Sequence, residues 1–231
     1  MSTTAYLSRL EHTPLFGDLP REILKKMVSA CHVSHWKKGQ VIDNDEGTLF
    51  LNIIVRGRVK MSQTDLKTGR NITLFILAEG DVFDVLSLLD GQPHLSLFTA
   101  QDDVILLRVP MEKAREWLRD YPRFNARFLP YIGRQMRHLE HLSESLVFDD
   151  TLTRLAKLIL HHTDTENGEP EGHPVRLIND LPHEVLAELI GTVRTVVTTQ
   201  LRKLKEEEIV LRKEGRIVVT KLEALKKKYA F

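Results

Sequence analysis

The sequence predicts an α+β protein in which an antiparallel β domain is followed by helices and then by a winged helix-turn-helix. Three observations indicate this order. Short runs rich in Val, Ile, Leu and Phe, separated by glycines, fill residues 15–109. The apolar period becomes helical after Pro110, and two helices joined by a glycine turn precede a hairpin near the end. We therefore expect three parts, residues 1–120, 121–148 and 149–231.

The first part contains the predicted strands. A helix precedes them, because apolar residues repeat at helical spacing from Leu19 to Val28 after Asp18, a residue type that caps helices. Several short strands at close spacing are typical of an antiparallel sandwich or barrel. The predicted strands are residues 41–42, 49–55, 58–62, 71–77 and 103–109, and the separating glycines are Gly39, Gly47, Gly57, Gly69, Gly80 and Gly91.

The second part is predicted to be helical. Pro110 suits a helix start, and a short helix over residues 111–120 should end before Tyr121-Pro122. The longer helix that follows carries an apolar seam with steps of 4, 3, 4, 3 and 4 residues and one polar position. Such a heptad seam pairs with another helix, or else lies on its own domain. The seam residues are Phe128, Ile132, Gln135, Leu139, Leu142 and Leu146.

The third part has the layout of a winged helix-turn-helix. Asp149, Asp150 and Thr151 can cap a helix that ends before the polar stretch 164–174. Helices are expected over 184–190 and 193–207, joined by a turn at Gly191 that favours a positive φ. A hairpin pairs 209–212 with 216–220.

This third part is also basic. The chain holds 33 basic and 32 acidic residues, but residues 191–231 hold 11 basic and 5 acidic, a net of +6, against −5 for residues 1–190. A basic module fits either a polyanion-binding domain or a solvated basic surface. For double-stranded DNA, Arg194 can bond guanine bidentately. The predicted base-reading residues are Arg194, Thr195, Thr198 and Thr199, and the predicted phosphate contacts are His183, Thr192, Arg202, Lys203 and Arg216.

Several functions are excluded by what the sequence lacks. It has no nucleophile elbow, phosphate-cradling glycine loop or His-Glu-x-x-His motif, so we predict no enzyme and no catalytic residues. The single cysteine, Cys31, cannot form an internal disulfide, a Cys-x-x-Cys zinc site or an iron–sulfur cluster. No apolar run approaches the roughly 20 residues of a membrane span, and the first residues do not resemble a signal peptide. We expect a cytoplasmic protein.

Five segments, in this order, resemble the Crp–Fnr transcription regulators. They are Pro14-Leu15-Phe16-x-x-Leu19, Trp36 to Ile42, Ile54 to Val59, Gly80 to Phe83, and Leu181 to Ile209 with the following hairpin. The resemblance implies an N-terminal double-stranded β-roll sensor, a long central dimerisation helix and a C-terminal winged helix. It also implies a homodimer on a pseudo-palindromic DNA site, which contacts RNA polymerase if it is an activator.

The chain departs from the known branches of this family. Val85 stands where cyclic-nucleotide-binding members carry a glutamate, and His94 and Leu95 replace their phosphate-binding Arg-Ser pair. An anionic phosphate needs a charge-assisted donor, so we do not expect cyclic AMP to bind. The CO-sensing members carry a haem-ligating Cys and His at the positions of Asp84 and Leu86. In the recognition helix, Thr195 and Thr199 replace a common Glu and Arg, which should shift base preference.

The effector therefore remains open. The apolar residues after Gly80 are either β-roll core or the lining of a pocket for an apolar ligand or a haem, whose axial donors would be His94, Cys31, His32 or His35. We predict a regulator with an effector other than a cyclic nucleotide; a haem-based NO or CO sensor and an effector-independent regulator are the alternatives. The pocket candidates are Val82, Phe83, Val85, Leu86, His94, Leu95, Leu97 and Leu139.

Overall fold

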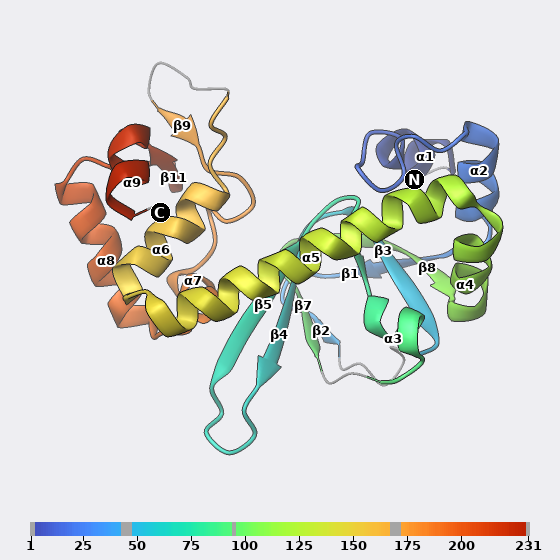
Figure 1. Ribbon diagram of the computed structural model, residues 1–231, viewed down its shortest axis with the longest axis horizontal. Helices are drawn as coiled ribbons and strands as arrows, with labels where there is room; N and C mark the ends of the chain where they lie inside the picture. The colour runs from blue at the N-terminus through green and yellow to red at the C-terminus, as the bar shows by residue number, and fades with distance from the viewer. Residues whose placement is uncertain (1–2, 43–47, 94–95, 167–171, 230–231) are drawn as a thin grey trace. The chain divides into compact units, whose positions relative to one another are not determined.

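The structure is a computed structural model that describes residues 3–42, 48–93, 96–166 and 172–229. The chain forms two compact units (Figure 1). One unit comprises residues 1–63 and 75–138, and the other comprises residues 64–74 and 139–231. The division falls inside the long helix α5 (Pro122–Phe148), which corresponds to the predicted helical part over residues 121–148.

Two four-stranded sheets form the β domain; the sequence predicts the antiparallel architecture and five of these strands, but not those over residues 32–36, 82–83 and 97–100. The paired strands with a described register, such as β3 with β8, are antiparallel. One sheet has the order β1 (His32–Trp36), β8 (Val104–Pro110), β3 (Phe50–Arg56) and β6 (Val82–Phe83). The other has the order β2 (Val41–Ile42), β7 (Leu97–Ala100), β4 (Val59–Thr64) and β5 (Asn71–Leu77).

The side chains of strand β3 point alternately into two hydrophobic cores. Successive side chains of a strand point to opposite faces. Leu51 and Ile53 belong to the core shared with the helices, whereas Ile54 belongs to a second core together with residues of both sheets. In this second core the Phe83 ring lies 4.4 Å from that of Phe98 and 5.8 Å from that of Trp36 (centroid distances). The interior of the β-roll is thus filled by aromatic rings at this point.

Four helices accompany the sheets. They are α1 (Thr3–Leu10), α2 (Arg21–Ser29), α3 (Val85–Asp90) and α4 (Met111–Asp120). The sequence predicts α2 and α4 but neither α1 nor α3. Helix α2 begins after Pro20 rather than at Asp18, because the Pro20 carbonyl accepts from the N–H groups of Ile23 and Leu24. Helices α2 and α4 bury their apolar faces, including Leu24 and Trp117, against the outer face of β3 and β8.

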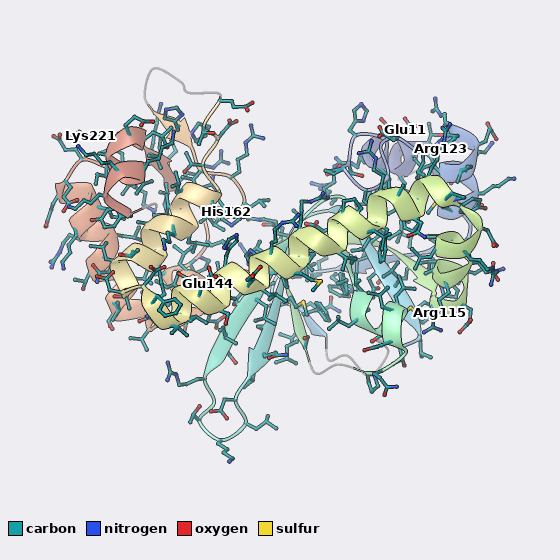
Figure 2. All side chains as sticks on the ribbon, viewed as in Figure 1. Glu11, Arg115, Arg123, Glu144, His162 and Lys221 are labelled. Carbon is teal, nitrogen blue, oxygen red and sulfur yellow. The ribbon has the colours of Figure 1, made fainter. Side chains whose placement is uncertain are left out.

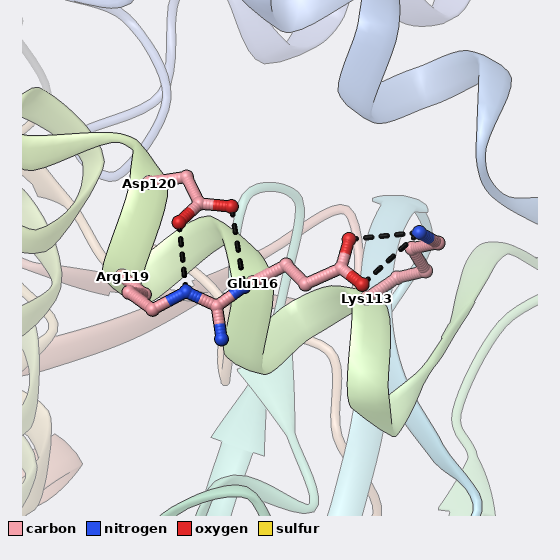
Figure 3. Close-up of polar contacts among 4 residues, drawn as sticks. All are labelled: Lys113, Glu116, Arg119 and Asp120. Atoms are coloured by element: carbon pink, nitrogen blue, oxygen red, sulfur yellow. Dashed lines mark hydrogen bonds and ion pairs between the residues drawn. The ribbon is translucent and has the colours of Figure 1, made fainter.

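The outer face of α4 is a solvated, charged surface. Lys113 pairs with Glu116, and Arg119 pairs with Asp120 (Figure 3). Exposed pairs of this kind contribute little to stability. Arg115, labelled in Figure 2, differs because its guanidinium donates to the carbonyl oxygens of Ser87 and Leu88 at 3.1 and 3.3 Å. It therefore satisfies carbonyls at the end of α3.

The N-terminal half of α5 packs on the β domain. Phe124, Phe128 and Tyr131 are buried in the core shared with the helices. The Tyr131 hydroxyl accepts from the Val82 N–H and donates to the Val82 carbonyl, both at 3.2 Å. Strand β6 is thus held by β3 on one side and by a helix side chain on the other.

The second unit contains the predicted winged helix-turn-helix. Helix α6 (Thr151–His161) is capped by Asp150, whose carboxylate accepts from the Thr153 N–H at 2.7 Å, as predicted. The later helices are α7 (His183–Leu189), α8 (Arg194–Glu206) and α9 (Leu222–Tyr229). Strands β10 (Val210–Lys213) and β11 (Arg216–Val219) form the predicted hairpin, and β9 (His173–Pro174) adds a third strand beside β11. The sequence predicts neither β9 nor α9.

Candidate nucleic-acid interface

Helices α7 and α8 are held by a small apolar core and a tight turn. Leu186, Ala187, Val197 and Leu204 are buried between the helices and the rest of the unit. Gly191 has φ +63°, as predicted, and a Cβ atom there would lie 2.6 Å from Leu146 Cδ2. The left-handed backbone favours glycine at this turn, whereas the Leu146 methyl group ends a flexible side chain that can shift.

The opposite face of α8 is exposed and basic. Arg194, Thr195, Thr198 and Thr199 are all exposed, and Arg202 and Lys203 follow on the same helix. The hydroxyls of Thr198 and Thr199 donate to the carbonyls four residues earlier, at 3.0 and 3.1 Å. Each hydroxyl hydrogen is therefore used inside the helix, so the two threonines present a methyl group and an acceptor oxygen outward.

The predicted phosphate residues lie on several elements. His183 is the first residue of α7, Thr192 is in the turn, and Arg216 starts β11. Arg202, Lys203 and Arg216 are exposed, whereas His183 and Thr192 are partly buried. The pKa of His183 lies below its ordinary value, first because the ring is partly desolvated and then because the positive charges of Arg212 and Arg194 are near.

Sequence reasoning missed Arg212. Its Nη1 lies 3.5 Å from His183 Nε2, and its Nε donates to the Gly215 carbonyl at 3.0 Å. The register of the hairpin could have identified this residue, because Arg212 is paired with Ile217 and Ile217 is buried. Directly paired residues share one face of a sheet, so Arg212 is on the side of the hairpin that faces the domain.

The exposed apolar face of α5 differs from the predicted seam at two of its first four positions, with Leu129 in place of Phe128 and Met136 in place of Gln135. Phe128 is 1% exposed and belongs to its own domain's core, which corrects the prediction at this residue. The neighbouring Leu129 is 62% exposed, Met136 is 66% exposed and Leu139 is 40% exposed. Ile132, Gln135, Leu142 and Leu146 are partly buried. Taken in chain order, Leu129, Ile132, Met136 and Leu139 are separated by 3, 4 and 3 residues, which is again a heptad pattern.

The predicted effector residues do not converge on one site in the described part of the chain. Phe83 is buried between the sheets, whereas Val82 and Val85 contact the core on the helix side. Leu86 is exposed on α3, Leu97 is partly buried on β7, and Leu139 lies on the exposed side of α5. His94 and Leu95 lie outside the described residues.

The remaining haem-ligand candidates are not grouped either. The Cys31 thiol donates to the Met27 carbonyl at 3.2 Å, and burial raises its pKa to about 12, so the thiolate that binds iron is disfavoured. His32 and His35 are exposed on β1. Among the described residues, no three His, Cys, Asp or Glu side chains are grouped for a metal ion. In the same residues, no helix has the length and apolarity of a membrane span.

A polar cluster inside the β-roll was also missed. Asn52 Nδ2 donates to Asp84 Oδ2 at 2.5 Å, and Arg108 Nε donates to Asn52 Oδ1 at 3.2 Å. The Arg108 guanidinium lies over the Phe50 ring, 4.4 Å from its centroid. Asp84 is buried and has φ +67°, a conformation that non-glycine residues rarely adopt. These contacts join three elements distant in sequence, so no local pattern reveals them.

Comparisons with known proteins agree with this fold. Residues 33–121 match the family model of the cyclic nucleotide-binding domain, and residues 153–228 match that of the Crp-like helix-turn-helix domain. A solved structure of a CooA mutant from Carboxydothermus hydrogenoformans has a TM-score of 0.74 at 22% identity, covering 87% of this chain and 89% of that chain. This likeness concerns the fold alone.

Sequence identity to curated relatives indicates the family. A CRP-like cAMP-activated global transcriptional regulator of Mycobacterium tuberculosis is 30% identical over 151 residues, which are 65% of this chain and 66% of the relative, just under two thirds of its length. The global nitrogen regulator of Synechococcus elongatus is 32% identical over 184 residues, which are 77% of this chain and 80% of the relative. With both domains in the same order and this identity over most of its length, the chain belongs to the Crp–Fnr family of transcription regulators.

Proposed function

We propose that the protein is a sequence-specific DNA-binding transcription regulator and not an enzyme. The observation that carries this proposal is the exposed face of α8, where Arg194 and three threonines lie in the first two turns of a helix that follows the turn at Gly191. The N-terminal residues of a recognition helix reach base edges in the major groove. The basic residues around them supply phosphate contacts.

The active form in this proposal is a homodimer. The exposed residues Leu129, Met136 and Leu139, with Ile132, form an apolar stripe along α5 at heptad spacing. A second copy of the same helix would cover this stripe symmetrically. A symmetric dimer reads a pseudo-palindromic site with half-sites one helical turn, about 10–10.5 base pairs, apart.

The effector is proposed to be something other than a cyclic nucleotide. At the position of the family's ribose-binding glutamate, Val85 is apolar and contacts the core instead. Such a residue offers no hydrogen bond to a sugar hydroxyl. A haem that responds to NO or CO, or the absence of any effector, remains the alternative, and an absorbance spectrum of the purified protein separates the haem case. The proposed place of action is the cytoplasm, and the regulator would contact RNA polymerase there if it is an activator.

Selection from a random library of double-stranded DNA tests the proposal. We expect the full-length protein to enrich an inverted repeat with a guanine in each half-site. A control variant, Gly191→Val, should fail to enrich any site, because a β-branched residue does not readily adopt the positive φ of this turn. Enrichment of no sequence by the folded wild-type protein would overturn the proposed function.

A further inference from the structure

Three elements of the second unit meet at the ring of His183. Its Nδ1 lies 2.9 Å from the Thr198 hydroxyl on α8, and its Nε2 lies 3.5 Å from Arg212 Nη1 on β10. The first helix of the helix-turn-helix, the recognition helix and the wing are thus connected through one imidazole. The ring belongs to a residue that is only partly buried, so an incoming ligand can reach it.

The hydrogen bonds define the tautomer of His183. The Thr198 hydroxyl has one hydrogen and donates it to the Arg194 carbonyl at 3.0 Å, so the same hydroxyl must accept from His183 Nδ1. The neutral ring then has its hydrogen on Nδ1 and a lone pair on Nε2. This lone pair faces Arg212, which is a donor at every accessible pH.

Partial burial and the surrounding charges favour the neutral ring in the free protein. Arg212 from β10 and Arg194 from α8 are the charged groups that act on it, both positive, while Glu184, the next residue of α7, is exposed. Partial desolvation and then these two cations lower the pKa of His183. Protonation of Nε2 would place a positive charge next to Arg212, and the two charges would repel each other unless an anion lay between them.

The Arg212 guanidinium is held in place for such an anion. Its Nε donates to the Gly215 carbonyl at the tip of the hairpin, which fixes the plane of the group. Within the described part of the chain no carboxylate pairs with it. Its remaining N–H groups can therefore bind an oxyanion, for which the planar arginine fork is well suited.

We propose that His183 and Arg212 together bind one phosphate of the DNA backbone, and that His183 takes up a proton when this phosphate binds. A phosphate oxygen only accepts hydrogen bonds, so it cannot bond to the lone pair of Nε2. Binding between the two side chains requires a hydrogen on Nε2, and the phosphate charge stabilises the resulting imidazolium. This inference rests on the proposed function and adds to it a linkage between DNA affinity and pH.

Binding titrations between pH 6 and pH 8 test the linkage. We expect the association constant to rise as the pH falls, by at most tenfold per pH unit for each chain, because at most one proton is taken up per chain. A selected site and a non-specific duplex should show the same pH dependence, since the phosphate carries no sequence information. Calorimetry in two buffers of different ionisation enthalpy should measure the proton uptake directly.

Variants distinguish the effect of proton uptake on DNA affinity from the effect of the phosphate contact itself. His183→Arg carries a permanent charge and should bind independently of pH, with the affinity that the wild type reaches at pH 6. His183→Gln offers a neutral donor and should also be independent of pH but bind more weakly at pH 6. Arg212→Ala should weaken binding and reduce the salt slope by about one per half-site. Lys213→Ala, which removes a charge from the same hairpin, should keep the full pH dependence.

The outcomes distinguish failure of the proton linkage from failure of the proposed DNA-binding function. Binding with no proton uptake, or a pH dependence that persists in His183→Gln, would overturn the linkage and leave the DNA-binding function standing. Full pH dependence and full affinity in Arg212→Ala would remove Arg212 from the site. Failure of the folded wild type to bind any duplex at any pH would overturn both.

Discussion

Tyr131 and Val82 exchange two hydrogen bonds, one from the Val82 N–H to the hydroxyl and one from the hydroxyl to the Val82 carbonyl. This contact joins α5 to the segment that follows Gly80. Burial is the main reason that the pKa of Tyr131 lies above its ordinary value, and the nearby Asp81 carboxylate raises it further. The hydroxyl is thus a neutral donor and acceptor at every physiological pH.

Tyr131→Phe removes this hydroxyl without removing the ring. We expect a loss of about 1–3 kcal/mol in the free energy of unfolding, because two buried backbone groups lose a partner. Denaturant titration of the full chain, followed by tryptophan fluorescence from Trp117 and Trp36, measures it. An unchanged midpoint would mean that Val82 finds other partners.

Gly80→Ala should destabilise the β domain more than Gly39→Ala. Both glycines have a positive φ, +89° and +82°, so both variants incur left-handed strain of roughly 1–2 kcal/mol. A Cβ at Gly80 would also lie 2.5 Å from Thr13 Cγ2, whereas nothing lies within 4 Å of the corresponding position at Gly39. Overpacking adds about 1–3 kcal/mol. Equal melting temperatures for the two variants would contradict the role of Thr13.

Asp150→Ala should destabilise α6 by about 0.5–2 kcal/mol through loss of the N-cap. Hydrogen bonds from Thr153 lower the pKa of Asp150, so its contribution is present above the unfolded pKa and is lost as the pH falls through the folded pKa. Asp150→Asn keeps a capping side chain and should lose this acid dependence. Hydrogen exchange in the first turn of α6 at pH 3 to 7 measures both effects.

Arg194→Ala should cost about 1–3 kcal/mol of binding free energy on the preferred site and relax the preference at one base pair per half-site. Lys203→Ala should instead weaken binding to all sequences and reduce the salt slope by about one per half-site. Titrations against the preferred site and single-base variants at two salt concentrations compare the two. Equal losses for Arg194→Ala on every sequence would show that it contacts only phosphate.

Met136→Glu should convert the proposed dimer to a monomer, because it places a charge from each chain in the apolar stripe of α5. Arg137→Glu is the matched control: the residue is exposed on the same helix but outside the stripe, so the dimer should persist. Sedimentation velocity of both variants gives the answer. A dimeric Met136→Glu variant would place the dimer contact elsewhere.

The parts of the molecule that depend on local patterns could be predicted. Asp150 caps α6, and Gly191 makes the turn between α7 and α8, because capping and positive φ depend on residues a few positions apart. The antiparallel sheets also follow from strand length and glycine spacing. In contrast, β9 consists of two residues and depends on pairing with β11, which no local period shows.

Other features depend on tertiary packing, that is, on which face of a helix or strand contacts which other element. Apolar spacing along α5 fits a stripe containing Phe128 as well as one containing Leu129, and only packing against the β domain shows that Phe128 is the buried one. Arg212 and His183 lie 29 residues apart, and they meet because β10 returns to α7. The buried polar contacts of Asn52 likewise need strand register, which the sequence leaves undetermined.

The state of Cys31 has a practical consequence. Its thiol is the chain's only one, and with a pKa near 12 almost none of it is thiolate at neutral pH. Alkylating reagents attack thiolates, so the native cysteine should react slowly. A cysteine introduced at an exposed position beside the proposed contact surfaces, such as Lys205 on α8 or Arg137 on α5, would then be labelled selectively. Fluorophores at these two sites could follow DNA approach and helix pairing.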